Sequence, residues 1–282
     1  MFSSSVSHTP VIFLACVNSY RGGKRLRHLV HERKAIAKLF PAFNHKSRYE
    51  AIQKGNLPNR YFFNQLQSNE YQNRVSVMHL VGHADSDHLR LESDNFETPI
   101  HLEELSKLIG MLPNLQAVFL SGCATEGLVD MLIRRDVPAI IVTQTADKDP
   151  NATSIAREFY RELAEGKTVQ EAARKLGRSY PSNFRSHQVN YDLDSDTFNW
   201  NGKGGPLQWG VYFLAENAEK LDEPATIRPL IPFSQSRPVK RLKRKLSYLT
   251  YATVALLVGV LAVGITMYLQ TPQQLSQLLA LW

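Results

Sequence analysis

The sequence predicts an α/β domain built on a doubly wound, mostly parallel sheet flanked by helices. Short apolar runs that break at glycine or polar residues predict buried strands at 11–17, 76–82, 117–122, 139–143 and 209–215. Segments with apolar residues at helical spacing predict helices at 24–40, 102–111, 126–135, 153–164 and 168–177. Strands that alternate with helices are typical of parallel α/β sheets. One such domain over residues 1–216 is large enough to bury its own core.

Three segments have weaker patterns. Residues 89–91 and 98–100 indicate a small hairpin between the second strand and the helix that follows it. Residues 48–66 mix aromatic and polar side chains and receive no assignment. Residues 182–206 are polar and rich in Asn, which predicts a long surface loop beside a binding cleft.

The net charge of +7 is a local property of the chain. Six basic residues without an acid lie close together, and the rest of the chain is nearly neutral. These residues are Arg237, Lys240, Arg241, Lys243, Arg244 and Lys245. We therefore expect no nucleic-acid partner, which would call for a basic surface on the folded domain.

A membrane anchor is predicted after this basic cluster. Residues 247–269 are uncharged and mainly apolar, which is enough to cross a bilayer as one helix. Basic residues on the N-terminal side predict a single-pass protein with its large N-terminal domain in the cytoplasm. Residues 217–246 are then a Pro-rich, basic linker, and residues 270–282 form a short uncharged tail.

Two strand ends carry the candidate chemistry. The predicted strand 76–82 is followed by His83, and the strand 117–122 is followed by Cys123. If the two strands are neighbours, a thiol and an imidazole meet at the carboxyl edge of the sheet, where α/β proteins place their sites. A nearby helix N-terminus would favour the thiolate form of Cys123. His83 would act as its base, and the N–H groups of Cys123 and Ala84 as oxyanion donors.

Other interpretations of the same residues stay open. A buried cysteine is often only a small apolar side chain, and a histidine at a strand end is often only hydrogen-bonded. Residues 83–88 (HADSDH) also resemble the metal motif of metallo-β-lactamase-fold hydrolases, with His101 and His187 as the remaining histidines. His79 and His83 are too far apart along a strand to hold one ion. We expect no metal and no cofactor. Two cysteines in the chain predict no disulfide framework, as in a reducing compartment.

Residues 78–84 (MHLVGHA) and 119–125 (FLSGCAT) resemble the His and Cys blocks of the CHAT domain family, caspase-like cysteine peptidases. Further matching segments at 11–15, 26–32, 159–163 and 206–209 extend the resemblance over about residues 10–216. The resemblance implies a caspase-like sheet in which the His and Cys strands are adjacent. It implies that His83 and Cys123 form the catalytic dyad, and that His79 is non-catalytic. Ala84 stands where the family commonly has glycine.

The resemblance leaves the substrate pocket open. Asp147 and Asp149 follow a predicted strand and would select a basic residue before the scissile bond, although an Asp-rich turn capping a helix explains them equally well. Arg21 would instead favour acidic substrates. We expect a membrane-anchored cysteine endopeptidase that cleaves a partner protein in prokaryotic signalling or defence. A second protein would activate it. The alternative is a non-catalytic, membrane-tethered interaction module.

Overall fold

The computed structural model describes residues 9–16, 27–42, 49–55, 59–84, 88–91, 98–143, 151–182, 184–192, 197–200, 203 and 207–214. The strands are β1 (Val11–Cys16), β2 (Glu50–Gly55), β3 (Val75–Val81), β4 (His83–Ala84), β5 (His88–Leu91), β6 (Thr98–His101), β7 (Ala117–Ser121), β8 (Ala139–Thr143), β9 (Arg185–Asp192), β10 (Thr197–Asn199) and β11 (Gly210–Leu214). The helices are α1 (Arg27–Ala42), α2 (Asn59–Leu66), α3 (Leu102–Gly110), α4 (Glu126–Arg134), α5 (Asn151–Ala164) and α6 (Val169–Ser179).

A large, mostly parallel sheet forms the centre of the domain, as predicted. Its strand order is β10-β9-β11-β8-β7-β3-β1-β2. The pairs from β2 through β8 are parallel, whereas β11 runs antiparallel to β8 and β10 runs antiparallel to β9. The chain starts at β1, adds β2 on one side, and then returns to place β3 on the other side. This reversal makes the sheet doubly wound, and in such sheets ligands bind at the carboxyl ends of the strands beside the reversal.

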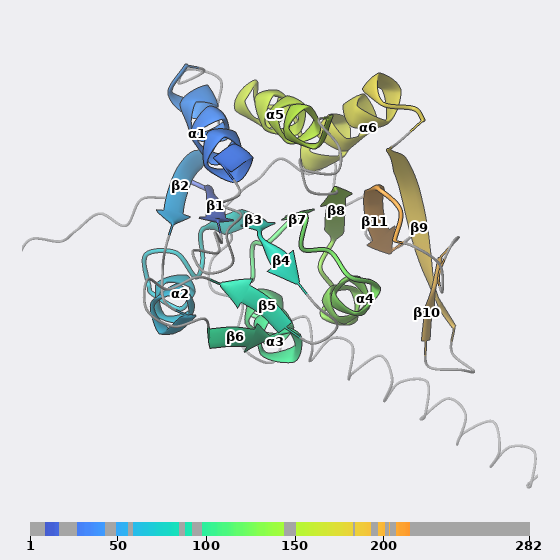
Figure 1. Cartoon of the computed structure of the whole chain (residues 1–282), viewed down its shortest axis with the longest axis horizontal. Coiled ribbons are helices and arrows are strands. Elements are labelled where there is room, and N and C mark those ends of the chain that lie inside the picture. The colour runs from blue at the N-terminus through green and yellow to red at the C-terminus, as the bar shows by residue number, and fades with distance from the viewer. Residues whose placement is uncertain are drawn as a thin grey trace, which may run out of the picture. The chain divides into compact units, whose positions relative to one another are not determined.

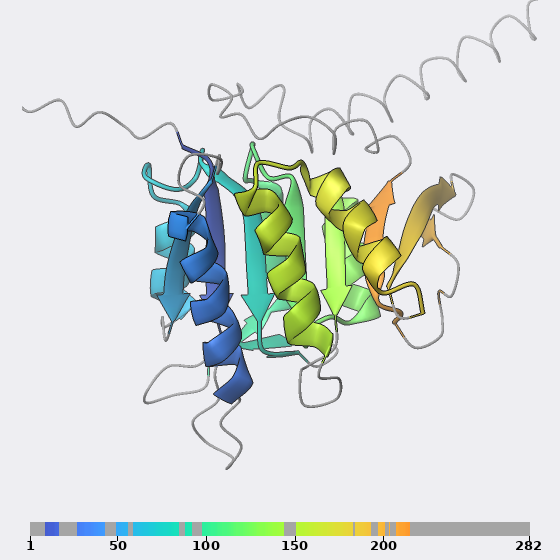
Figure 2. The same ribbon diagram turned by 90° about the horizontal axis from the view of Figure 1, so that it is seen from above.

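Helices cover both faces of this sheet (Figures 1 and 2). Helices α1, α5 and α6 lie on one face, and α2, α3 and α4 lie on the other. Each face has its own apolar cluster between the helices and the strands. Strands β3, β7 and β8 are buried at every position, because helices cover them on both sides. This double cover explains why their sequences are nearly continuous apolar runs.

A second, small sheet has the order β4-β5-β6. Strands β5 and β6 pair in antiparallel fashion, which confirms the predicted hairpin. Strand β4 pairs with β5, so that His83 lies opposite Arg90 and Ala84 opposite Leu89. A single residue, Gly82, thus separates the small sheet from β3.

The predicted loop at 182–206 is wrong in part, because the structure has β9 and β10 there. Strand β9 pairs in parallel with β11, while its outward positions stay exposed. Only His187 and Val189 are buried along it, so the composition is that of a surface segment although the backbone is in the sheet. The unassigned segment 48–66 contains β2 and α2.

The predicted linker 217–246, membrane span 247–269 and tail 270–282 all lie outside the described residues. Within the ranges that the structure describes, none of the helices has both the length and the apolar character that a bilayer crossing needs.

Gly210 provides a test of how β9 and β11 pack. Its φ is +152°, and a Cβ added there would lie 1.9 Å from the carbonyl oxygen of Arg185. We expect Gly210→Ala to lower the free energy of unfolding by at least about 2 kcal/mol, because the backbone of β9 must move. Thermal unfolding of the two proteins measures the difference.

Gly177→Ala is the matched control. Gly177 lies in α6, and a Cβ there meets nothing within 4 Å. Helix propensity alone should make this variant as stable as the parent, or more stable by up to about 1 kcal/mol. Equal effects of the two substitutions would contradict the assigned packing of β9 on β11.

Candidate functional site

The two strands that precede His83 and Cys123 are direct neighbours. Strands β3 and β7 are parallel, and their last paired residues are Val81 and Ser121. His83 follows Val81 by two residues, and Cys123 follows Ser121 by two residues. The two residues therefore leave the same edge of the sheet from equivalent register positions. The predicted adjacency of the His and Cys strands is confirmed.

Glycines end both strands. The N–H of Gly82 donates to the carbonyl of Ser121 at 3.3 Å, and the N–H of Gly122 donates to the carbonyl of Thr143 at 3.1 Å. These bonds extend the sheet ladder by one step. Gly122 has a φ of +72°, a conformation that glycine adopts at little cost. Glycine at position 122 therefore lets the chain leave the strand and turn at Cys123.

The Cys123 thiol points into the protein. The residue is only 1 % exposed and belongs to the apolar cluster on the face of α2, α3 and α4. Its Sγ donates to the carbonyl oxygen of Leu80 on β3 at 3.3 Å. Burial raises the pKa of the Cys123 thiol to about 12, although nearby backbone hydrogen bonds oppose part of this rise. In this conformation the thiol is protonated at neutral pH.

The expectation that the following helix favours a Cys123 thiolate is therefore wrong for this conformation. Helix α4 begins after its N-cap residue Thr125, whose hydroxyl accepts a hydrogen bond from the N–H of Leu128 at 3.2 Å. Cys123 lies two residues before this cap. Burial of the thiol against Leu80 outweighs the helix-end electrostatics, which fall off within a turn.

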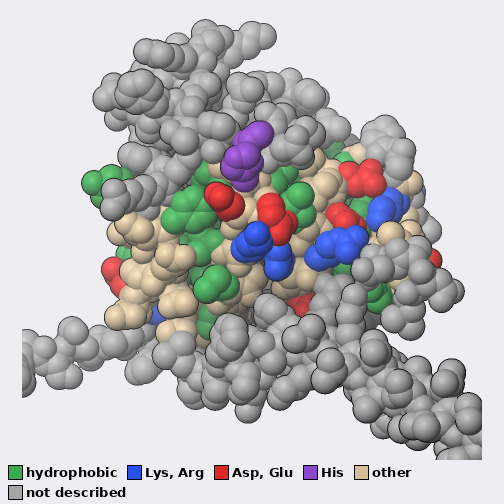
Figure 3. Space-filling model, turned by 90° about the horizontal axis from the view of Figure 1, so that it is seen from below, with side chains coloured by type: hydrophobic (Ala, Val, Ile, Leu, Met, Phe, Trp, Pro, Cys, Tyr) green, Lys and Arg blue, Asp and Glu red, His purple; other side chains and the backbone are tan. Residues whose placement is uncertain are grey.

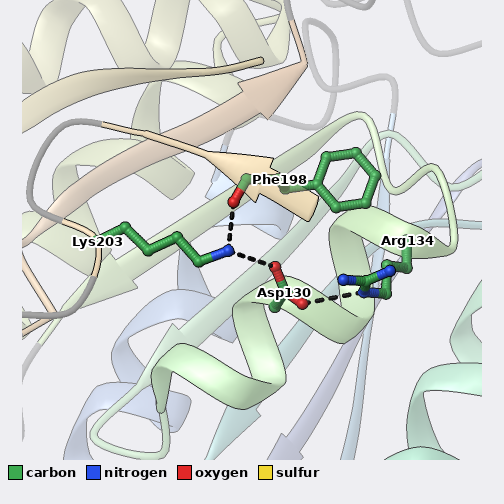
Figure 4. Close-up of polar contacts among 4 residues, drawn as sticks. All are labelled: Asp130, Arg134, Phe198 and Lys203. Carbon is green, nitrogen blue, oxygen red and sulfur yellow. Dashed lines mark hydrogen bonds and ion pairs between the residues drawn. The ribbon is translucent and has the colours of Figure 1, made fainter. Parts of the chain in front are cut away.

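Helix α4 also contacts β10, the strand at the edge of the large sheet (Figure 4). Asp130 on α4 accepts a hydrogen bond from Nε of Arg134 at 3.0 Å, and Nζ of Lys203 lies 3.5 Å from its other oxygen. Lys203 also donates to the carbonyl of Phe198 on β10, and the Arg134 guanidinium lies 5.4 Å from the centre of the Phe198 ring. These contacts tie the helix that follows Cys123 to β10.

His79, the first histidine of the His block, is buried and packs against residues of α1 and α5. Its Nε2 lies 3.3 Å from Oε1 of Glu32 on α1, and both side chains are almost fully buried. The geometry of this pair makes no hydrogen bond, since both atoms lack a hydrogen-bond partner among the described residues. The His79 ring stacks on Tyr160 of α5, with ring centres 5.4 Å apart. His79 thus joins β3 to α1 and α5, consistent with the expected non-catalytic position.

The sequence analysis did not identify two buried hydroxyls at the ends of β7 and β8. Ser121 and Thr143 are register partners at the ends of β7 and β8, and both are at most 2 % exposed. Neither hydroxyl has a hydrogen-bond partner within the described part of the chain. A buried hydroxyl without a partner costs about 1–3 kcal/mol, so such groups are prepared to bind a polar group. No sequence pattern singles them out, because Ser and Thr are common at strand ends.

Several predicted site residues cannot be placed. Asp147, Asp149 and Arg21 lie outside the described residues, as does Asp85 of the alternative metal motif. Of His83 and Ala84 the structure describes the backbone of β4. The hydrogen bond between His83 and Cys123 and the oxyanion donors therefore stay predictions.

Among the described histidines of the metallohydrolase interpretation, His88 and His101 lie together across β5 and β6, whereas His187 lies in the large sheet. His187 is buried on β9 with its ring stacked on Tyr212, with ring centres 4.5 Å apart. His101 ends β6 in the other sheet. Among the described residues, no three His, Cys, Asp or Glu side chains lie close enough to share a metal ion.

The burial of Cys123 predicts slow alkylation in the free protein. Because burial raises the thiol pKa to about 12, little thiolate exists near neutral pH and reagent access is blocked. We expect iodoacetamide at pH 7.5 to label Cys123 at least about 100-fold more slowly in the native protein than in urea. The native rate should keep rising with pH beyond pH 9. Peptide mass spectrometry separates Cys123 from Cys16, and equal native and unfolded rates would contradict the buried conformation.

Comparisons with known proteins place the chain in a family. No curated protein sequence matches it significantly. Among solved structures, the chain is similar to the Drosophila initiator caspase Dronc, with 13% identity, 75% of this chain and 85% of that chain covered, and a TM-score of 0.42. The family model described as the CHAT domain matches residues 16–204, well over half of the chain. This match includes both strand ends described above, and the chain therefore belongs to the CHAT domain family.

Proposed function

We propose that this chain is a membrane-anchored cysteine endopeptidase with Cys123 as nucleophile and His83 as general base and acid. The observation that carries the proposal is the in-register pairing of β3 with β7, which brings His83 and Cys123 to one edge of the sheet. Membership of the CHAT family supports a caspase-like peptidase domain and a protein substrate.

The reaction follows from the chemistry of these groups. His83 takes the thiol proton, and the Cys123 sulfur forms a bond to the carbonyl carbon of the scissile peptide. The N–H groups of Cys123 and Ala84 donate to the oxyanion. His83 then gives the proton to the leaving amine as the C–N bond breaks. Water, deprotonated by His83, cleaves the thioester and restores the thiol.

Catalysis requires a conformation other than the one described. The thiol must leave the carbonyl of Leu80 and reach the edge of the sheet before His83 can deprotonate it. We propose that an activating partner protein shifts the domain toward that conformation. Binding energy from the partner offsets the cost of exposing the apolar surroundings of Cys123.

The same burial favours a second candidate, a non-catalytic interaction module. A cysteine that is 1 % exposed with a pKa raised to about 12 behaves like a small apolar side chain. On this view the α/β domain recruits proteins to the membrane without cleaving them. The two candidates differ in whether Cys123 becomes reactive when a partner binds.

We assign the substrate contacts to the same edge of the sheet. Asp147 and Asp149, which follow β8 in the sequence, would select a basic side chain before the scissile bond. We also propose a role in prokaryotic signalling or defence, with the segment 247–269 anchoring the domain on the cytoplasmic side of the membrane.

Cys123→Ala tests the peptidase directly. We expect the variant to lose cleavage of a peptide library by at least about 1,000-fold, because no nucleophile remains. Its thermal unfolding should stay close to that of the parent, since the change removes one buried atom. Cys16→Ala is the matched control and should cleave normally. Undiminished cleavage by Cys123→Ala would refute the assignment. A Cys123 that stays unreactive toward a thiol-directed peptide electrophile in a partner-bound sample would favour the interaction module.

The membrane anchor has its own test. Leu257 lies in the middle of 247–269, where an arginine costs about 2.5–3.5 kcal/mol for insertion as a helix. We expect the parent protein to remain in the membrane fraction after carbonate extraction, and Leu257→Arg to shift substantially to the soluble fraction. Leu257→Ala serves as the control and should stay with the membrane. A parent protein that extracts fully would contradict the anchor.

A further inference from the structure

We propose that His88 and His101 form a binding site for a divalent transition-metal ion of the zinc and copper class. The two residues are direct partners across the antiparallel pair β5–β6. Their ring centres lie 4.4 Å apart, and the ring planes make an angle of 50°. Directly opposed residues in an antiparallel pair point to the same face of the sheet. The register alone therefore brings two imidazoles together.

The histidine pair lies on the outer face of the small sheet. Their chain neighbours Leu89 and Ile100 are buried in the apolar cluster, at 0 % and 2 % exposure. Because side chains alternate along a strand, His88 and His101 lie on the opposite face. His101 is exposed and His88 is half-buried. Figure 3 shows histidine side chains at the surface with acidic side chains beside them. An ion from solvent can therefore reach the pair.

The geometry fits a shared ion. A metal that binds two imidazole nitrogens at about 2.0–2.1 Å needs rings that stand side by side and tilt toward a common point. The 4.4 Å between the ring centres is short enough for one ion to reach a nitrogen of each ring. His101 is also the N-cap residue of α3, yet its side chain makes no cap hydrogen bond, so capping the helix does not occupy its ring nitrogens.

Charged side chains near the histidine pair both favour and oppose the binding of a cation. Glu103 and Glu104 follow His101 in the first turn of α3 and attract a cation, although Glu103 also contacts Arg135 at 2.7 Å. Arg135 and Lys107, which both form ion pairs with Glu103, oppose a cation. Among the described residues no third ligand completes a cluster, and we propose that water fills the remaining positions. Such an open site favours Cu²⁺ over Zn²⁺, in the usual order of affinities.

Binding would affect the neighbouring strand. Strand β5 pairs with β4, which contains His83. An ion that bridges β5 and β6 reduces the fraying of the strand on which β4 rests. The site stands independently of peptidase activity, and its test uses protein without a reactive cysteine.

The test measures Zn²⁺ and Cu²⁺ binding by calorimetry on the full chain in detergent, in a Cys16→Ala, Cys123→Ala background that removes thiol ligands. We expect one high-affinity ion per chain. His88→Phe, which keeps the ring contact but removes the ligand, and His101→Asn should each weaken binding at least about tenfold. His45→Ala, a histidine outside the pair, is the matched control and should bind as the background does.

Two further measurements separate a chelate from scattered histidine binding. Zn²⁺ should raise the melting temperature of the background protein and leave that of His88→Phe and His101→Asn unchanged. The double variant should bind little worse than either single variant, because a chelate is lost with its first ligand. Unchanged binding in both single variants would overturn the site, as would weakening by His83→Ala with no effect at His88 or His101.

Discussion

The parallel pairing of β3 with β7 is the constraint on which the proposed chemistry depends. Both strands are buried on both faces, so a slip of one residue would move each side chain from the apolar cluster in which it packs to the cluster on the opposite face. That loss of packing fixes the register that ends at Val81 and Ser121. The same register sets how far beyond the sheet His83 and Cys123 emerge. Core packing thus brings the backbones of His83 and Cys123 to the same edge of the sheet.

The position of the Cys123 backbone and the reactivity of its thiol depend on different features of the structure. The backbone brings the residue to the expected edge of the sheet, yet its thiol packs inward and bonds to the Leu80 carbonyl. Hydrophobic burial keeps the sulfur protonated, and only a change of conformation can expose it. The proposed peptidase would need a partner to bring about that change. An interaction module of the same fold would need no such change, and reactivity of Cys123 in the bound state distinguishes the two.

The predictions succeeded where burial imposes a pattern and failed where it does not. The continuous apolar runs of β7 and β8 reflect helices on both faces and predict central strands. Strand β9 has only His187 and Val189 buried, and its polar outer face resembles a loop. Its membership of the sheet comes from backbone pairing with β11, which is 20 or more residues away in the chain. Backbone hydrogen bonds between distant strands do not depend on which side chains the strands carry. The amino-acid composition of β9 therefore does not reveal them.

The amino-acid sequence by itself determined the fold class, the two strand ends that carry His83 and Cys123, and the family, because local periodicity and short motifs record them. It also predicts the apolar segment 247–269 as an anchor. Only the tertiary structure decided that the two strands are adjacent, that the thiol faces the core, and that His88 meets His101 across a hairpin. Strand order, side-chain burial and cross-strand register are properties of contacts between distant segments, which no local pattern encodes.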